Sequence, residues 1–462
     1  MSLPASFVVE LAARTVVIDG GAALLGGSPT RLLRLSAKAR GALRGRRIAA
    51  DTAVGAVLAD RLLESGLADP ELGALPAFDA DVTVVVPVRD RAPQLDRLLG
   101  ALTAHTAPSR IVVVDDGSRQ PGAIRRVVAS HGVRLVTSAE NRGPAAARNL
   151  GLRHVETPFV AFADSDVVLG PGAIPELLKH FHDPRVAAVA PRIIALGDGG
   201  GWVARYEAAR SSLDLGPEPA TVRPGSRVGW VPATCLLARV EALGSGFDES
   251  MRVGEDVDLV WRLVAAGHRV RYEPAVEVAH EHRTGLAAFV GRKFAYGSSA
   301  ASLGERHPAA ITPAILAPWS AAVMAALLAQ RRWSVPVASV ATVIAAARIA
   351  RRLDGLERRG PLALRLAGRG LLAAAAQTSA LLLRHWWPAT ALAAAGSRRA
   401  RRAVLAAAVV DAAVEYVRLE PGLDPVRFGI LRRIDDLAYG AGVWWSAIRA
   451  RRFAALRPTI RS

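Results

Sequence analysis

The sequence predicts an α/β domain between residues 79 and 300, built on an open, doubly wound and mostly parallel sheet. Two observations predict it: short, fully apolar runs recur from Val82 onward, and segments of helical periodicity separate them. Continuous β-branched runs are typical of parallel strands covered by helices on both faces, because neither face of such a sheet meets water. The apolar runs lie at residues 82–86, 110–114, 134–137 and 159–163.

A smaller α+β unit is predicted in front of this domain, over residues 1–78. β-prone runs at 7–11 and 15–18 precede a Gly-Gly turn, and helical patterns follow at 31–43 and 54–65. This strand, helix, helix order is similar in outline to a winged-helix or peptide-chaperone module. A simple structural cap is the alternative interpretation.

The back of the chain, residues 301–462, is predicted to be a cationic helical region. Residues 1–282 hold 32 basic and 32 acidic side chains, whereas residues 283–462 hold 27 and 9, so the net charge of +18 lies entirely behind residue 282. Arginine clusters among short apolar helices suit the interface of an anionic membrane.

The apolar runs of this region set the expected membrane topology. An uncharged run at 311–330 is long enough for a span, although Pro313 and Pro318 interrupt it, and the next run, 334–347, is too short. We expect interfacial helices at the cell membrane, on its cytoplasmic side, with room for one true span. An Ala-rich bundle packed on the α/β domain is the alternative. No basic segment followed by an apolar run opens the sequence, so no cleaved signal peptide is expected.

Polar side chains follow three of the predicted strands. In open α/β sheets, ligands bind at the carboxyl ends of the parallel strands, so these residues are expected to share one substrate-binding edge. They are Pro87, Arg89 and Asp90 after the first strand, Asp115 and Asp116 after the second, and Asp164 and Asp166 after the fourth.

The Asp-Ser-Asp segment is the candidate metal site. In an extended segment that enters a turn, alternate side chains converge, so Asp164 and Asp166 can bracket one divalent ion. Mg²⁺ and Mn²⁺ prefer such oxygen ligands and keep positions open for phosphate oxygens. The same pattern also occurs in ordinary turns and helix caps. The single cysteine, Cys235, excludes a cysteine cluster and is expected to be a core residue.

Candidates for the nucleotide side of the site surround the second strand. Asp115 and Asp116 can accept hydrogen bonds from a base N–H or from ribose hydroxyls, and an Asx turn is the alternative. Gly143 precedes an Ala-rich helix with Arg148 about one turn inside it. The start of this helix and the guanidinium can face a base or a phosphate.

An acidic helix start at residues 254–259 offers a general base. Asp256, or with less support Glu255, can take a proton from an attacking hydroxyl group. Favourable negative charge at a helix N-terminus is the alternative interpretation. His280 can complete the metal site. Trp230 is expected to line the side where a second substrate binds.

These motifs, in this order, resemble the family 2 glycosyltransferases of the GT-A fold. The matching segments are residues 86–90, 113–118, 141–149, 164–166 and 254–259, within roughly 82–300. The resemblance implies a nucleotide-sugar donor whose nucleoside contacts Asp116. It also implies that Asp164 and Asp166 bind the ribose, the diphosphate and a Mn²⁺ or Mg²⁺ ion, with His280 as a further metal ligand. Asp256 becomes the base of an inverting single displacement, in which metal charge on the leaving diphosphate replaces a general acid.

The whole layout, with its front unit and cationic tail, is similar to the glycosyltransferases of the mycofactocin system. That similarity implies transfer of glucose from UDP-glucose to a small molecule derived from a peptide. Residues 292–297 lack the Gln-x-x-Arg-Trp pattern of processive polymer synthases. A polyprenyl phosphate or a cell-wall glycan is the alternative acceptor.

A non-catalytic binding protein with a basic tail is the alternative from another class. It would bind nucleic acid or membrane with salt-sensitive affinity. The tail shows no aromatic-interleaved groove and no zinc spacing, so a nucleic-acid partner is not expected.

Overall fold

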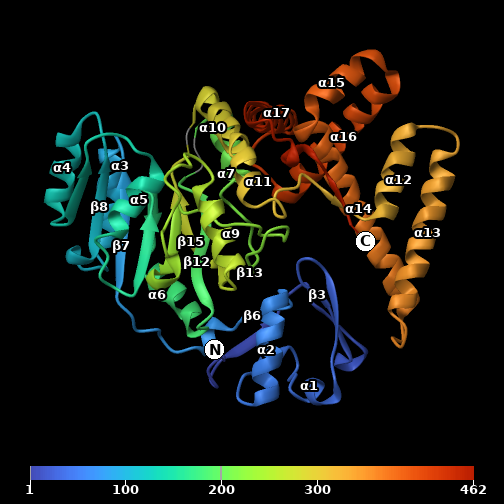
Figure 1. Cartoon of the computed structure of the whole chain (residues 1–462), viewed down its shortest axis with the longest axis horizontal. Coiled ribbons are helices and arrows are strands. Elements are labelled where there is room, and N and C mark those ends of the chain that lie inside the picture. Colours follow the sequence, from blue (N-terminus) through green and yellow to red (C-terminus); the bar gives the residue numbers. More distant parts are fainter. Residues whose placement is uncertain (1, 198–199, 283, 462) are drawn as a thin grey trace. The chain divides into compact units, whose positions relative to one another are not determined.

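The computed structural model describes residues 2–197, 200–282 and 284–461, which form two compact units (Figure 1). The first unit comprises Met1–Asp198 and Ser211–His282, and the second comprises Gly199–Arg210 and Arg283–Ser462. The change in net charge along the sequence falls at the same place, behind residue 282. The predicted domain limits at residues 78 and 300 divide the chain into three parts instead of two, and they stay predictions.

A nine-stranded mixed sheet forms the centre of the first unit. Its order is β11-β15-β12-β14-β10-β7-β8-β9, and β13 pairs with β15. The strands are β7 (Val82–Val88), β8 (Ile111–Asp116), β9 (Arg134–Ser138), β10 (Phe159–Ala163), β11 (Val167–Leu169), β12 (Val186–Ala195), β13 (Ala220–Thr221), β14 (Cys235–Arg239) and β15 (Arg269–His280). Strands β10, β7, β8 and β9 are parallel, as their apolar runs predict.

The prediction of a mostly parallel sheet is wrong for the other half. This half is mixed: β14 runs antiparallel to both β10 and β12, and β11 runs antiparallel to β15, whereas β12 and β15 are parallel. The physical reason is connection length, because a parallel neighbour needs a crossover of a dozen or more residues. Only residues 164–166 separate β10 from β11, so β11 pairs elsewhere in the sheet.

Helices cover both faces of the parallel half of the sheet. They are α3 (Ala92–Thr103), α4 (Pro121–Ser130) and α5 (Pro144–Leu152). Leu95 of α3 and Ile124 of α4 lie in one core cluster with Val84 of the sheet. On the opposite face α5 approaches so closely that a Cβ atom at Gly151 would lie 2.3 Å from a methyl group of Val85. The carboxyl edge between these layers is where the polar strand ends emerge.

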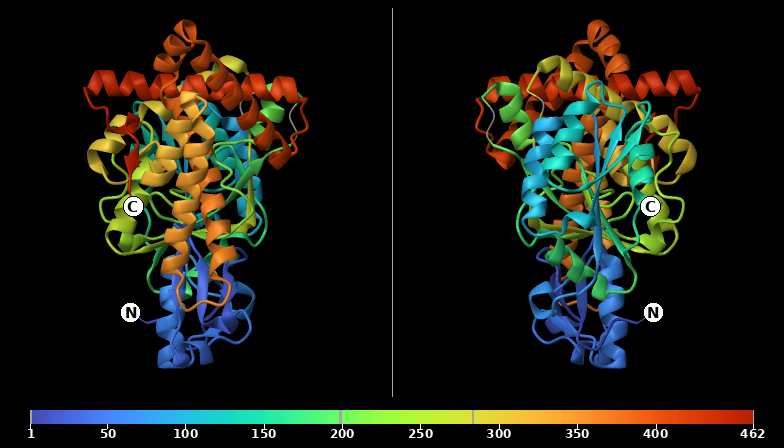
Figure 2. Two further views of the ribbon diagram at one scale, coloured as in Figure 1. Left: turned by 90° about the vertical axis from the view of Figure 1, so that its right-hand side faces the viewer. Right: turned by 90° about the vertical axis from the view of Figure 1, so that its left-hand side faces the viewer.

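Residues 2–75, which we call the N-terminal module, form two small antiparallel sheets and two α-helices (blue in Figures 1 and 2). Its elements are β1 (Val8–Leu11), β2 (Val16–Ile18), β3 (Ala23–Gly26), β4 (Arg31–Arg34), α1 (Ala37–Gly41), β5 (Arg47–Ala49), α2 (Ala53–Ser65) and β6 (Ala68–Pro70). The sheets have the orders β5-β1-β6 and β2-β3-β4. Phe7, Ile48 and Leu62 are buried in the core of the module.

The helix predicted at residues 31–43 is wrong. Its first half is strand β4, which pairs with β3, and only the five residues of α1 are helical. Ser36 Oγ accepts the N–H of Ala39, and this cap fixes the start of α1. Periodicity separates strand from helix poorly over so few residues. The observed order therefore differs from the strand, helix, helix order that suggested a winged helix.

The second unit is largely helical. Its elements are α7 (Trp202–Ala209), α10 (Leu286–Ser298), α11 (Ala300–Arg306), β16 (Ile315–Leu316), α12 (Pro318–Ala329), α13 (Ser334–Arg352), α14 (Arg359–Ala380), a π-helical turn (Leu381–His385), α15 (Trp387–Gly396), α16 (Arg398–Leu419), α17 (Pro425–Ala450) and β17 (Thr459–Ile460). Helices α10 and α17 touch backbone to backbone, because a Cβ atom at Gly442 would lie 2.0 Å from the carbonyl oxygen of Phe294.

Two segments of this unit, Ser334–Arg352 and Arg359–His385, are long and apolar enough to cross a membrane by length and composition. The expected span at residues 311–330 is wrong, because Pro318 starts α12 and this helix is only 12 residues long. The following run, expected to be too short, belongs to the 19-residue helix α13.

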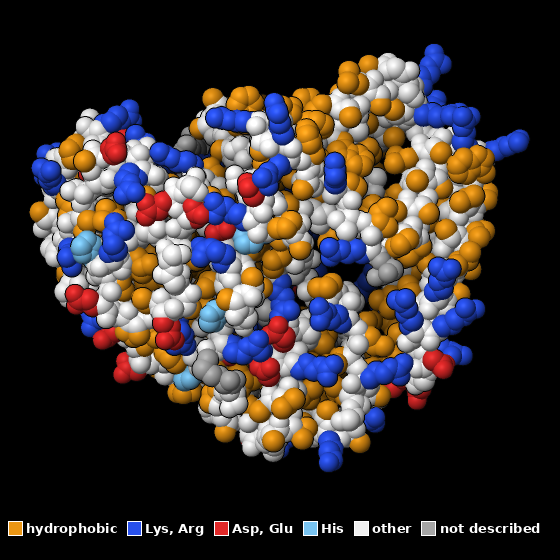
Figure 3. Space-filling view, in the orientation of Figure 1, with side chains coloured by type: hydrophobic (Ala, Val, Ile, Leu, Met, Phe, Trp, Pro, Cys, Tyr) orange, Lys and Arg blue, Asp and Glu red, His pale blue; other side chains and the backbone are white. Residues whose placement is uncertain are grey.

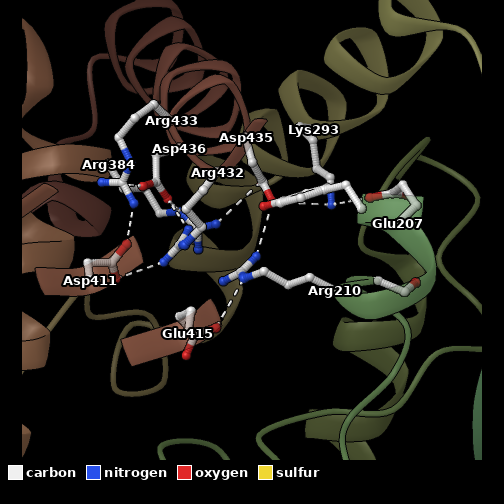
Figure 4. Close-up of polar contacts among 12 residues, drawn as sticks. Glu207, Arg210, Lys293, Arg384, Asp411, Glu415, Arg432, Arg433, Asp435 and Asp436 are labelled. Atoms are coloured by element: carbon white, nitrogen blue, oxygen red, sulfur yellow. Dashed lines mark hydrogen bonds and ion pairs between the residues drawn. The ribbon is translucent and has the colours of Figure 1, made fainter. Parts of the chain in front are cut away.

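A neutral group of ionisable side chains joins four helices of the second unit, and we call it the helical-unit cluster (Figure 4). Its members are the basic Arg210, Lys293, Arg384, Arg432 and Arg433 and the acidic Glu207, Asp411, Glu415, Asp435 and Asp436. Lys293 Nζ lies 2.9 Å from Glu207, and Arg432 Nη1 lies 2.7 Å from Asp436. Five charges of each sign tie α7, α10, α16 and α17 together.

Candidate active site

The polar strand ends come together because β10, β7 and β8 are neighbours in the sheet. Pro87 and Arg89 lie at the end of β7, followed by Asp90, whose backbone N–H donates to Ser118 Oγ at 2.9 Å behind β8. Asp90 also accepts hydrogen bonds from the backbone and the side chain of Arg119, and the side-chain bond is the main cause that lowers the pKa of Asp90. The predicted shared edge therefore exists.

Asp115 and Asp116 fasten loops at this edge. Asp115 accepts the N–H of Ser118 at 3.0 Å, a local contact three residues along the chain rather than the two of an Asx turn, which was the alternative interpretation. The two carboxylate oxygens of the buried Asp116 accept the backbone N–H groups of Arg142 and Gly143, each at 2.8 Å. Gly143 has a φ of 96°, which favours glycine at the position that starts α5. Asp116 thus holds the entry of α5 against the end of β8.

Arg148, on α5, lies between two carboxylates. Its Nη2 donates to Asp164 at 2.7 Å and its Nη1 donates to Glu255 at 2.8 Å. The guanidinium also lies over the ring of Phe247. Burial lowers the pKa of Arg148, but the charges of Asp164 and Glu255 outweigh it and raise the pKa overall, so the side chain stays charged. Arg148 therefore links the end of β10 to the helix that carries the predicted base.

Asp166 and His280 come together through the pairing of β11 with β15, in which Val167 lies opposite His280. His280 Nε2 lies 3.4 Å from Asp166 Oδ2. Arg91, at the start of α3, forms an ion pair with the same carboxylate. Asp166 is buried, whereas the Asp164 side chain is 27% exposed.

The donor chemistry of Asp164, Asp166 and His280 fits Mn²⁺ or Mg²⁺, which accept carboxylate oxygens. Within the described parts of the chain, no group of three His, Cys, Asp or Glu side chains lies close enough to hold an ion as it stands. The guanidinium of Arg91 supplies the positive charge beside Asp166, and Arg148 supplies it beside Asp164. A divalent ion would have to replace the Arg91 contact.

Asp256 stands near the start of α9 (Glu255–Ala265). Its Oδ1 accepts the N–H of Val257 at 2.8 Å, and its Oδ2 lies 3.4 Å from the N atom of Ala233. Burial, together with the charge of Glu255, raises the pKa of Asp256 to about 7 against the opposing charge of Arg148. A base with a pKa near 7 takes up protons efficiently at neutral pH. Glu255 is committed to Arg148, so Asp256 is the better placed of the two candidates.

The segment at residues 230–234 connects Asp164 to Asp256. We call it the acceptor-side segment, because Trp230 is expected to line the side where the second substrate binds. Thr234 O accepts the N–H of Asp164 at 2.9 Å, while the neighbouring Ala233 faces Asp256. The half-buried Trp230 lies at its start. Cys235 follows in β14, where burial raises the pKa of its thiol to about 12, as a core residue requires.

Sequence reasoning missed Arg91 and Trp261. Trp261 Nε1 donates to Gly229 O at 2.8 Å and so fastens the start of the acceptor-side segment to α9. Its sequence signal is its place five residues after Asp256 on the same amphipathic helix. Arg91 directly follows the polar end of β7, but its pairing with Asp166 depends on strand register that the sequence does not display.

The sequence model of the family described as Glycosyl transferase family 2 matches residues 83–243. The pre-mycofactocin glycosyltransferase of Mycobacterium tuberculosis is 45% identical over 472 aligned residues, which cover 100% of this chain and 99% of that protein. The chain belongs to glycosyltransferase family 2. This family 2 glycosyltransferase is also 32% identical to the N-acetylglucosaminyl-diphospho-decaprenol L-rhamnosyltransferase of the same species, over 49% of this chain and 85% of that protein.

Among solved structures, a mannosyltransferase from Pyrobaculum calidifontis in complex with GDP-Man and Mn²⁺ aligns at 21% identity and a TM-score of 0.38. The alignment covers 64% of this chain and 86% of that one. The predicted resemblance to the family 2 glycosyltransferases, and to those of the mycofactocin system, is confirmed by the sequence relatives. The protein is a glycosyltransferase with a GT-A-like α/β fold, a mixed sheet and a helical C-terminal region.

Proposed function

We propose that this glycosyltransferase moves glucose units one at a time from UDP-glucose to a hydroxyl group of a pre-mycofactocin acceptor, each by a single displacement that inverts the anomeric carbon. The observation that carries the proposal is the 45% identity to the M. tuberculosis pre-mycofactocin glycosyltransferase, which extends over both chains. The geometry of the carboxylates at the sheet edge supports the same reaction class.

Asp256 is the proposed general base. It takes the proton of the acceptor hydroxyl, whose oxygen forms a bond to the anomeric carbon while the bond from that carbon to the diphosphate oxygen breaks. The raised pKa supports this role, because a carboxylate that binds a proton near pH 7 is a far stronger base than an ordinary aspartate. Glu255 and Arg148 act as positioning residues that keep the start of α9 beside Asp164.

The donor is proposed to bind along the ends of β7, β8 and β10. Pro87, Arg89, Asp90, Asp115, Asp116, Gly143, Arg148 and Asp164 are the substrate-binding candidates on this side. Asp164, Asp166 and His280 would hold a Mn²⁺ or Mg²⁺ ion, whose charge stabilises the departing diphosphate. Arg91 would then exchange its contact with Asp166 for one with solvent or with the donor.

Trp230 is proposed to line the acceptor side. A half-buried indole offers a flat apolar surface together with one N–H donor, which suits a sugar ring or the aromatic part of a small molecule. Its position at the start of the segment that faces Asp256 supports this assignment.

A lipid-linked acceptor is the second candidate, and the apolar helices of the second unit favour it. Helices α12 and α13 present a large apolar surface with arginines at its ends (Figure 3). The exposed residues of α13 include Val335, Val340, Val343 and Ile344. Arg331 and Arg332 precede this helix, and Arg351 and Arg352 form its last two positions. We propose that this surface binds the anionic cytoplasmic face of the cell membrane, whichever acceptor is used.

A panel of nucleotide sugars tests the function. The purified enzyme is incubated with each donor, with Mn²⁺, Mg²⁺ or EDTA, and with pre-mycofactocin or a polyprenyl phosphate as acceptor, and products are identified by mass spectrometry. We expect cation-dependent addition of hexose from UDP-glucose to pre-mycofactocin, and at least a ~1,000-fold loss of rate in Asp166→Ala.

The outcomes separate the alternatives. Hexose on the polyprenyl phosphate alone would move the assignment to the lipid-linked acceptor. Full activity in EDTA, or in Asp166→Ala, would contradict the metal site. No transfer from any donor to either acceptor would contradict the proposed reaction.

A further inference from the structure

The N-terminal module docks on the α/β domain through buried arginines of β15. Arg269 is 2% exposed, and its guanidinium reaches Asp60 of helix α2 at 2.7 Å and Asp183 of the α/β domain at 2.7 Å. Arg271 is 1% exposed and reaches Asp69 of β6 at 2.6 Å. Charge-assisted contacts of this kind are strong when they are buried and correctly paired, so the module is held at this end of β15.

A second set of contacts joins the module to residues 218–229, a stretch in which only the two-residue strand β13 is regular. Strand β13 itself pairs with β15 of the α/β domain, and four further contacts come from the N-terminal module. They are Arg14 Nε to Glu218 at 2.8 Å, Leu63 O to Thr221 Oγ1 at 2.9 Å, Glu64 to Arg223, and Ser28 Oγ to the backbone N–H of Arg227 at 2.7 Å. The module thus fixes this stretch at four places along its length.

The same stretch runs directly into the acceptor-side segment. Gly229 accepts the indole N–H of Trp261, Trp230 follows, and Ala233 faces Asp256. The contact at Arg227 is therefore only six positions from a residue beside the proposed base. The α/β domain holds other points of this path, because Thr221 pairs with β15 and Trp261 fastens Gly229. Between these points, the contacts of Arg223 and Arg227 with other parts of the chain come from Glu64 and Ser28 of the module, so the order of this turn depends on the module.

We propose that the N-terminal module is a positioning domain that orders residues 218–234 and thereby sets the acceptor side of the active site. The inference rests on the proposed function in assigning Trp230 and its neighbours to the acceptor. The proposed donor residues follow β7, β8 and β10, and among them Asp164 touches this path through Thr234, at its far end from the module contacts. Loss of the module contacts should therefore affect use of the acceptor more strongly than binding of the donor. The relevant positioning residues are Ser28, Glu64 and Arg223.

The test uses the full-length double variant Ser28→Ala/Arg223→Gln, which removes two contacts of the stretch and leaves the core of the module intact. The matched control is Arg47→Gln, which removes an Arg–Glu ion pair to Glu71 inside the module. Hydrogen exchange of residues 222–234 is measured together with donor affinity, by calorimetry with UDP-glucose, and with kcat and KM for the acceptor. A thermal melt of each variant verifies folding.

We expect exchange in residues 222–234 to become about tenfold faster in the double variant, because the two lost contacts hold this stretch in its closed form. The acceptor KM should rise about fivefold or more, whereas the donor affinity should stay within about twofold. The control should match the wild type in all three measurements.

Unchanged exchange would overturn the proposal, since the module would then not order the stretch. Faster exchange with an unchanged acceptor KM and kcat would also overturn it, because the contacts would serve stability alone. Failure of the proposed function has a different signature, since the wild type itself would transfer no sugar to the acceptor, and hydrogen exchange would still decide whether the module orders residues 222–234.

Discussion

The two units of the molecule each contain a group of buried charges, and the two groups differ in balance. At the sheet edge of the first unit, the carboxylates of Asp164, Asp166, Glu255 and Asp256 face the guanidiniums of Arg91 and Arg148. In the helical-unit cluster, five basic and five acidic side chains neutralise each other (Figure 4). The first group has an excess of negative charge that a bound cation can offset, whereas the second group has no excess charge.

The pKa directions of one aspartate in each group express this difference. Burial raises the pKa of Asp256, and no cation offsets it fully, so the value reaches about 7. Burial raises the pKa of Asp435 as well, but the charges of Lys293, Arg384 and Arg210 outweigh it, and the pKa is lowered. A cluster whose charges balance thus serves the fold, whereas a cluster with excess negative charge can take up a proton or bind a cation.

The largest expected effect on stability comes from breaking the balanced cluster. Asp435→Asn keeps the shape of the side chain but leaves Lys293 and Arg210 buried with too little negative charge, which should cost about 3 to 5 kcal/mol of unfolding free energy. Urea denaturation measures it. The exposed pair of Asp354 and Arg359 gives the control, and Asp354→Asn should change the stability by less than ~0.5 kcal/mol. Equal losses in both variants would contradict the structural role of the cluster.

A smaller effect on stability should follow when Mn²⁺ binds at Asp164, Asp166 and His280. Mn²⁺ at about 100 times its dissociation constant should stabilise the wild type by about 2.7 kcal/mol, because it binds only the folded protein. Differential scanning fluorimetry with and without Mn²⁺ measures this shift. Asp166→Ala should lose the shift, whereas Asp354→Asn should retain it. A shift of equal size in Asp166→Ala would place the ion elsewhere.

A third comparison concerns the pH dependence of stability in EDTA. The folded pKa of Asp256, about 7, lies above its ordinary value of 3.8, so the stability that this group contributes is full below about pH 4 and is lost as the pH rises through 7. An asparagine carries no such dependence. Asp256→Asn should therefore melt at least ~3 °C above the wild type at pH 8, and the difference should shrink steadily toward pH 4. A difference in melting temperature that does not depend on pH would show that folding does not raise the pKa of Asp256.

The parallel half of the fold and the acidic strand ends could be predicted from the sequence, because buried β-branched runs and the rule for the carboxyl ends of strands are local patterns. The mixed half could not, since the pairing of β11 with β15 joins residues more than a hundred positions apart. Long separations along the chain also hide the contact between Arg91 and Asp166, which are 75 positions apart, and that between Arg148 and Glu255, which are 107 positions apart.

The N-terminal module shows a different limit. The pattern at residues 31–43 has leucines at spacings that fit a short strand and a helix alike, and tertiary pairing with β3 decides between them. Its contacts with residues 218–229 link parts of the chain that the sequence offers no reason to connect. Site residues whose role depends on long-range packing, such as Trp261, escape sequence reasoning for the same reason.

The central claim is that Asp256 is the base of the transfer. Asp256→Asn is compared with Asp258→Asn, which alters a buried aspartate two residues along the same helix that pairs with Arg262. The steady-state kcat/KM for transfer from UDP-glucose is measured for both, with donor affinity determined by calorimetry. We predict a fall of about 10² to 10⁴ in Asp256→Asn with unchanged donor affinity, and a change below about tenfold in Asp258→Asn. Near-normal turnover in Asp256→Asn would contradict the account.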